Sequence, residues 1–298
     1  MCISAQPAQF KGTRILVAAQ KDGTHIVFYD CKAKSGAIAS ESSFPPAVDE
    51  TTQLPEVPLM EGSSNANAMI LLIPRKKGTE IEVIDTEGAE TILQDLSDSC
   101  RTLEASFSLS SRGAGVKGTF RVTETGIFHV VTADSASQIL EGIASDKVPV
   151  GKKADVSREL LEGLEKKAPD YAFAVACFNN NQSKRAAPVG IQYTPALPDY
   201  FVFPALDGHD GNAPTDEDVG IDHELFAGAV EGSGLKAING VEVQYKYTGS
   251  IRHLLPKHVT YRKFPEGTKM PNGDFVISVT DALNFNWGDM RRMVCSLV

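Results

Sequence analysis

The sequence predicts an α+β fold made mainly of antiparallel β-sheet, with three or four helices packed against the sheets. About ten short runs are rich in β-branched and aromatic residues, against three or four helical patterns. The joins between successive runs are short and hairpin-like, without the regular strand–helix alternation that builds parallel sheets. We expect one compact domain over residues 1–298, with a β-rich N-terminal lobe (1–148) and an α+β C-terminal lobe (149–298).

The first two predicted strands, residues 13–20 and 25–31, are joined by Lys21-Asp22-Gly23. Asp-Gly between two such runs is a strong hairpin signal. Residues 32–67 are rich in Ser, Pro and Glu and predict a long loop. The unbroken apolar run 68–74 that follows predicts a buried strand stopped by proline.

Apolar residues recur at helical spacing in three segments, 88–96, 134–145 and 155–167. Asp134 is the expected N-cap of the second helix. The third is the clearest, because two lysines at its end suit the helix dipole and Pro169 stops it. Further strands are predicted at residues 79–84, 119–122, 126–132, 171–178, 189–193, 200–205, 241–247 and 275–280.

Charge and cysteine usage narrow the class of protein. The net charge of −9 disfavours nucleic acid and anionic membranes as partners. No window reaches the roughly 18 apolar residues of a membrane span, and the first residues lack the apolar core of a signal peptide. Five scattered cysteines indicate free thiols in a reducing compartment, so a soluble cytoplasmic protein is expected. They are Cys2, Cys31, Cys100, Cys177 and Cys295.

The most concentrated chemistry lies between residues 200 and 228, where two histidines are each flanked by acids. Residues 186–235 hold nine carboxylates and no Lys or Arg. His209, Asp210, Asp222 and His223 are candidate ligands of a divalent metal if the fold brings them together, although no cofactor is required. In the structural alternative, these acids cap turns and face the basic C-terminal part of the chain.

Cys2 is the candidate nucleophile. Removal of Met1 would expose a terminal cysteine with its own amine as base, as in N-terminal nucleophile hydrolases. Alternatively His223, oriented by a carboxylate, supplies the base, and His209 and Asp210 complete the candidate catalytic set. The alternative is that Cys2 packs as a small apolar residue. The glycines of 113–118 fit GxGxxG but precede a predicted strand, so a turn is the better interpretation.

Several fragments, in this order, resemble a family of uncharacterised bacterial proteins. They are residues 1–5 (MCISA), 67–74 (NAMILLIP), 170–175 (DYAFAV), Phe203-Pro204 with His209-Asp210-Gly211, and 222–225 (DHEL). The resemblance spans roughly the first 230 residues and implies no activity. It implies that Cys2 and both histidine motifs belong to one architecture.

The predicted function is therefore a small cytoplasmic hydrolase or amidase that uses Cys2 with the acid-flanked histidines. The alternative is a non-catalytic binding or assembly protein whose acidic loop is an interface or is ordered by a metal. A small molecule or a protein, including a second copy of the chain, is the expected partner.

Overall fold

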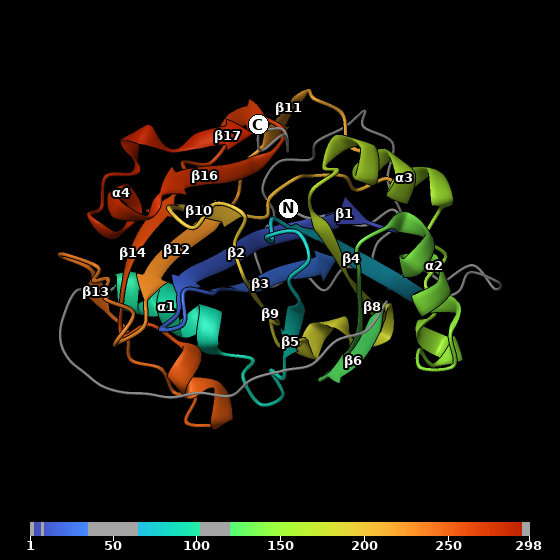
Figure 1. Cartoon of the computed structure of the whole chain (residues 1–298), viewed down its shortest axis with the longest axis horizontal. Coiled ribbons are helices and arrows are strands. Elements are labelled where there is room, and N and C mark those ends of the chain that lie inside the picture. Colours follow the sequence, from blue (N-terminus) through green and yellow to red (C-terminus); the bar gives the residue numbers. More distant parts are fainter. Residues whose placement is uncertain (1–2, 7–8, 35–64, 102–119, 294–298) are drawn as a thin grey trace, which may run out of the picture.

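Two large β-sheets lie face to face in the computed structural model, which describes residues 3–6, 9–34, 65–101 and 120–293 (Figure 1). Sheet A is antiparallel, in the order β1 (Ile3–Ser4), β4 (Ala66–Ile73), β8 (Ala172–Asn179), β7 (Phe128–Ala133), β6 (Arg121–Thr125). Sheet B has the order β13 (Val241–Glu242), β14 (His258–Lys263), β12 (Glu224–Ala229), β2 (Gln9–Ala19), β3 (His25–Lys34), β9 (Val189–Tyr193), β5 (Ile81–Ile84).

Smaller elements complete the fold. A three-stranded sheet contains β10 (Tyr200–Phe203), β16 (Asp274–Ser278) and β17 (Arg291–Met293), and β11 (Asp218–Gly220) pairs with β15 (Lys269–Pro271). The α-helices within the described residues are α1 (Ile92–Arg101), α2 (Ala136–Ala144), α3 (Arg158–Lys167) and α4 (Val279–Leu283). Short 3-10 helices are η1 (Val150–Lys152), η2 (Asn180–Arg185), η3 (Ser250–Leu254) and η4 (Trp287–Asp289).

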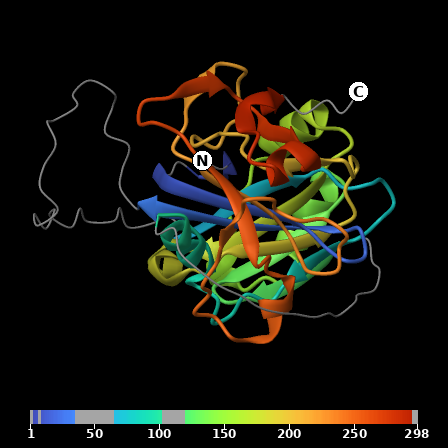
Figure 2. The ribbon, with the colours of Figure 1, turned by 90° about the vertical axis from the view of Figure 1, so that its left-hand side faces the viewer.

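The unbroken apolar strands arise because both faces of each large sheet are covered. In β4, Met69 and Leu71 face the core between the sheets, whereas Ile70 and Leu72 pack with residues of α2 and α3. In sheet B, alternate residues of β2 face the central core and α1. Side chains alternate along a strand, so a strand buried on both faces is apolar throughout. Figures 1 and 2 show α2 and α3 on one side of the paired sheets and α1 on the other.

The α+β class and its mainly antiparallel sheets are confirmed. The predicted first hairpin is present: Ala19 pairs with His25, and Gly23 at the turn has φ +80°. The apolar run 68–74 forms most of β4. The glycine-rich stretch 113–118 and most of the Pro-rich loop lie outside the described residues.

Two sequence predictions about local structure are wrong. Ser135, not Asp134, is the N-cap of α2, because its side chain accepts from the Gln138 amide while Asp134 forms an ion pair with Arg75. The predicted strand 241–247 pairs only over β13. Beyond it, the amides of Gln244 and Lys246 donate to side chains of α1 instead of a neighbouring strand.

Both large sheets take strands from before and after residue 148, so each sheet combines the two parts of the sequence. Within sheet B, β2 and β12 pair in parallel, with Arg14 opposite Glu224. Among the described residues, no helix is long and apolar enough to cross a bilayer.

Candidate functional site

Two buried polar residues from the end of the chain hold the loop that carries His209. Asp274, at the start of β16, is 1% exposed, and its Oδ1 accepts from the amides of Ala205 and Leu206 at 2.9 and 3.1 Å. Asn272 is equally buried, accepts from the amide of Asp207 at 2.9 Å and donates to the Asp207 carbonyl at 2.8 Å. The backbone leading to His209 is therefore fixed by side chains rather than by a sheet.

The N-terminal strand β1 lies against the same loop. Ile3 forms a parallel β-bridge with Gly208, and the amide of Ser4 donates to the Gly208 carbonyl at 2.9 Å. Gly211 has φ +80°, and a Cβ there would stand 2.9 Å from the carbonyl oxygen of Ala5. This approach requires glycine for both its conformation and its size. Residues directly after Cys2 thus contact the residues that flank His209.

Nε2 of His209 lies against Oδ1 of Asp207. The Asp207 side chain is 6% exposed and that of His209 is 27% exposed. Asn272 holds the Asp207 backbone, so the buried carboxylate has a fixed place beside a partly exposed imidazole.

Asp210, a predicted member of the same polar site, has a local role. Its carboxylate accepts from the amide and the side chain of Asn212 at 3.0 and 2.9 Å. The Asn212 side-chain hydrogen bond is the main cause that lowers the pKa of Asp210 below its ordinary value. Asp210 therefore caps a turn, and Asp207 is the acid that pairs with His209.

His223 lies in a different environment. It is 1% exposed, and its ring packs edge-on against Phe275 at a centroid distance of 5.3 Å. Its Nδ1 is 3.8 Å from Oδ1 of Asp222, whose Oδ2 accepts from the amide of Gly12 at 2.7 Å. Gly12 lies at a register shift in the β2–β3 pair, so Asp222 anchors a β-bulge.

Glu224, at the start of β12, links three elements. Its carboxylate accepts from Ser97 on α1 at 2.6 Å, from Lys263 on β14 at 2.7 Å and from Arg101 at 3.2 Å. Burial would raise the pKa of Glu224, but these hydrogen bonds and charges outweigh it and the pKa lies below its ordinary value. The Lys263 contact agrees with the expectation that the basic C-terminal part faces the acidic stretch.

The four predicted metal ligands do not form one cluster. His209 pairs with Asp207 beside β1, whereas His223 and Asp222 lie between β16 and the β2 bulge. Across the part of the chain that the structure describes, no three His, Cys, Asp or Glu side chains converge in a way that suits a metal ion. Cys2 lies outside the described residues, so its distance to either histidine stays a prediction.

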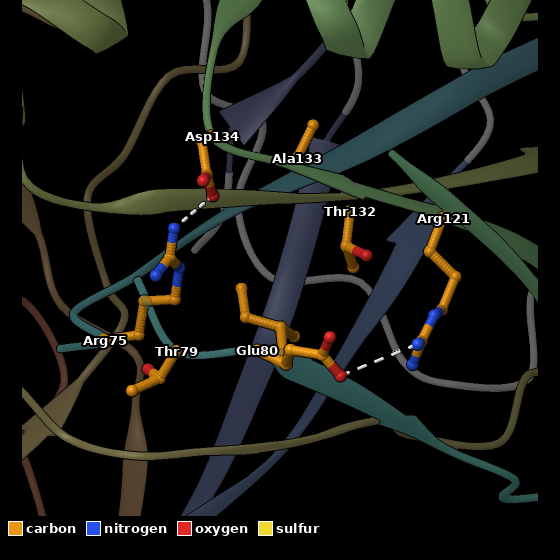
Figure 3. A pocket seen from close by; sticks show the side chains of 8 residues that line it. Arg75, Thr79, Glu80, Arg121, Thr132, Ala133 and Asp134 are labelled. Carbon is orange, nitrogen blue, oxygen red and sulfur yellow. Dashed lines mark hydrogen bonds and ion pairs between the residues drawn. The ribbon is translucent and has the colours of Figure 1, made fainter. Parts of the chain in front are cut away.

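A second polar site, lined by two arginines and two acids, was not predicted from the sequence. Arg75, Glu80, Arg121 and Asp134 surround a small pocket at the edge of the sheets (Figure 3). Its sequence signal is weak: Arg75 and Asp134 are charged residues placed directly after, or close to, the ends of buried strands β4 and β7.

Comparisons with known proteins add little to this picture. No protein-family model matches the sequence, and a search of curated proteins finds no match. Baculovirus P35 has a similar crystal structure at 10% identity, covering 94% of this chain and 92% of that chain, with a TM-score of 0.36. Two mutated baculovirus P35 structures after caspase cleavage have TM-scores of 0.38 and 0.34. The first is 10% identical and covers 91% of this chain and 92% of that chain. The second is 12% identical and covers 74% and 67%. TM-scores this low do not establish a shared fold, and a shared fold would not by itself define a function.

Proposed function

We propose that this chain is a cysteine-dependent hydrolase of amides, with the Cys2 thiol as nucleophile and His209 as general base. The observation that carries the proposal is the pairing of β1 with the His209 loop, where Ser4 donates to Gly208 at 2.9 Å. Ile3, the residue after Cys2, bridges Gly208, the residue before His209. A nucleophile and its base must lie within hydrogen-bond reach, and this pairing favours that geometry.

His209 is the better base because solvent reaches it. Its side chain is 27% exposed, whereas His223 is 1% exposed and packs against Phe275. Asp207 gives His209 a carboxylate partner that holds the ring and stabilises the imidazolium formed during the reaction. His223 then has a structural role in the proposal.

The reaction follows from these roles. His209 takes the thiol proton, and the Cys2 thiolate attacks the carbonyl carbon of the amide. The C–N bond breaks, and the nitrogen leaves with the proton from His209, which gives a thioester. Water, deprotonated by His209, then attacks the thioester and releases a carboxylic acid and the thiol. Because the thiolate is the nucleophilic form, the rate would depend on how readily His209 takes the thiol proton.

Removal of Met1 would supply a second base, the terminal amine of Cys2. Its ordinary pKa near 8 suits proton transfer at neutral pH. Intact-mass measurement tests this form directly, because retention of Met1 contradicts it. If Met1 is retained, His209 can still act as the base for Cys2, so the measurement distinguishes the two versions of the proposal.

Mapping of iodoacetamide alkylation by mass spectrometry tests the proposal. We expect Cys2 in the folded protein to react faster at pH 7 than a free thiol in a peptide of the same sequence. His209→Gln is expected to slow this reaction about tenfold or more, because the base is lost. His253→Gln, at a histidine on η3 whose Nδ1 lies 2.6 Å from the Ser250 carbonyl oxygen, is the matched control.

Two results would contradict the proposal. One is alkylation of Cys2 at the peptide rate. The other is a fast rate that His209→Gln and His253→Gln leave equally unchanged. A panel of small amides is the first set of substrates to assay. The scattered cysteines favour a reducing compartment, so the proposed location is the cytoplasm.

A binding or assembly module is the second candidate, and the exposed acids Glu217 and Asp218 favour it. Together they offer a negative surface to a basic partner or a second copy of the chain. Slow Cys2 alkylation together with self-association that weakens at high salt would favour this candidate. Stoichiometric zinc or manganese in the purified protein, lost in His209→Ala, would support its metal-ordered form.

A further inference from the structure

A pocket of about 80 Å³ opens where the turn after β4 meets β5, β6 and β7 (Figure 3). It lies outside the His209 loop and uses none of its residues. An isolated β-bridge between Arg75 and Pro195 fixes one wall. Of the residues that line it, Ile81 and Ala133 are apolar and the others are polar or charged.

Two ion pairs stand on opposite sides of this pocket. Arg75 pairs with Asp134 on one side, and Arg121 lies 3.7 Å from Glu80 on the other. The Arg75 side chain is 7% exposed, and its Nη1 donates to the Lys76 carbonyl at 3.1 Å. A guanidinium carries five N–H donors, so those two protein acceptors leave donors for a further acceptor group.

Glu80, by contrast, has an oxygen that lacks a hydrogen-bond donor in the part of the chain that the structure describes. Its Oε2 faces Arg121, whereas its Oε1 is buried and has no hydrogen-bond donor among the described residues. Figure 3 shows this second oxygen directed toward Thr132. A buried carboxylate oxygen without a donor costs free energy unless water or a ligand N–H group supplies one.

We propose that this pocket binds a small free α-amino acid. The ammonium group would donate to Glu80, and the carboxylate would accept from the guanidinium groups of Arg75 and Arg121. Since the pocket carries two positive and two negative side chains, a ligand with both charges matches it better than a simple anion or cation. The volume admits a few non-hydrogen atoms, which favours glycine or alanine over large side chains.

NMR titration of the full chain with glycine or L-alanine tests this proposal. We expect saturable shifts at the amides of Arg121 and Thr132. Acetate carries only the carboxylate and methylammonium only the ammonium, so each should bind at least about tenfold more weakly. L-tryptophan should give no shifts at these amides because it exceeds the pocket.

Glu80→Gln is the decisive variant, because it removes the charge and keeps the size. It should weaken glycine binding about tenfold. Glu82→Gln makes the same change on β5 at a residue that does not line the pocket, and it should leave binding unchanged. Arg121→Gln, at a partly exposed position, provides a second test if Glu80→Gln lowers thermal stability.

The proposal is overturned if glycine gives no saturable shift, which would leave a water-filled pocket between structural ion pairs. It is also overturned if acetate or methylammonium binds as tightly as glycine, or if Glu80→Gln and Glu82→Gln have equal effects. None of these results bears on Cys2 alkylation.

Discussion

His25 lies in the core between the two large sheets, where its ring packs against Phe201 at 5.1 Å and Tyr193 at 6.1 Å between centroids. The residue is buried, with 3% of its surface exposed. Burial lowers the pKa of His25 to about 4, from an ordinary value of 6.5. The folded protein therefore holds this histidine neutral at physiological pH.

This shift makes the free energy of unfolding depend on pH. In the unfolded chain His25 binds a proton as the pH falls below about 6.5, whereas in the folded chain it does so only near pH 4. The stabilisation is complete above pH 6.5 and is lost as the pH falls through this window, by up to about 3 kcal/mol. Urea unfolding at pH 7 and pH 4.5 should show a smaller difference in His25→Phe than in the unmodified chain.

His253→Gln removes a histidine from the surface of η3 and serves as the control for this measurement. It should keep the full pH dependence. Equal pH dependence in His25→Phe and the unmodified protein would contradict the buried neutral state.

Cys100 and Cys177 should be unreactive in the folded protein. Burial raises the pKa of each thiol to about 12, and the charge of Glu224 adds to the effect at Cys100. Almost no thiolate forms at pH 8, and neither sulfur is accessible. Iodoacetamide followed by mass spectrometry should leave both residues unmodified until urea is added. Modification of either one at the rate of an unfolded control would refute this prediction.

The sequence predicted a polar site of His209 with Asp210, whereas the structure places Asp207 beside His209. Asp207 and Asp210 both lie close to it in the chain, and only the structure separates them. Asn272 fixes the backbone of Asp207 from more than sixty residues away, while Asn212 occupies Asp210 locally. Contacts of such long range leave no local pattern, which also explains why the arginine-lined pocket was missed.

At the scale of elements, strands could be predicted from the sequence where both of their faces are buried. They were harder to predict where backbone amides donate to side chains instead of to a neighbouring strand. The alternation of residues 241–247 is real, since Val243, Tyr245 and Tyr247 pack with the α1 face of sheet B. The Val243 amide still donates to the Lys257 carbonyl, but Ser99 and Asp95 of α1 accept the amides of Gln244 and Lys246, so the regular strand ends at β13. Alternation reports burial on one side, and it does not report the hydrogen-bond partner.

The contact between the residues after β1 and Gly211 of the His209 loop can be tested by mutation. Gly211→Ala should destabilise the fold by about 2–3 kcal/mol, because the new Cβ meets the Ala5 carbonyl and the backbone has φ +80°. Gly234→Ala is a matched control with φ +81° and no atom within 4 Å. It should cost about 1 kcal/mol, for the backbone conformation alone. Urea unfolding measures both, and equal losses would show that β1 tolerates displacement.

For the whole molecule, the interleaved strands predict that neither half folds alone. In sheet A, β8 lies between β4 and β7, and in sheet B, β9 lies between β3 and β5. A fragment of residues 1–148 lacks both central strands and would expose their neighbours' edges. Its amide NMR spectrum should show the narrow dispersion of an unfolded chain, as should that of 149–298. A well-dispersed spectrum from either fragment would contradict this expectation.

The class of fold was predictable because composition and periodicity decide it residue by residue. The strand order was not, because the parallel pairing of β2 with β12 joins distant parts of the chain. Antiparallel hairpins can be predicted from the sequence of their turns, as at Asp22-Gly23. The pairing of two parallel strands has no such local sequence signal.

That parallel pair has a consequence for biosynthesis. The amide of Gly12 and the carboxylate of Asp222 meet across 210 residues, so β2 has only one of its two neighbours while most of the chain is still unmade. At about 5–20 residues per second, a ribosome needs roughly 10–40 s to cover that distance. Throughout this interval the open edge of β2 is a surface for chaperones to shield, and completion of the sheet waits for translation of β12.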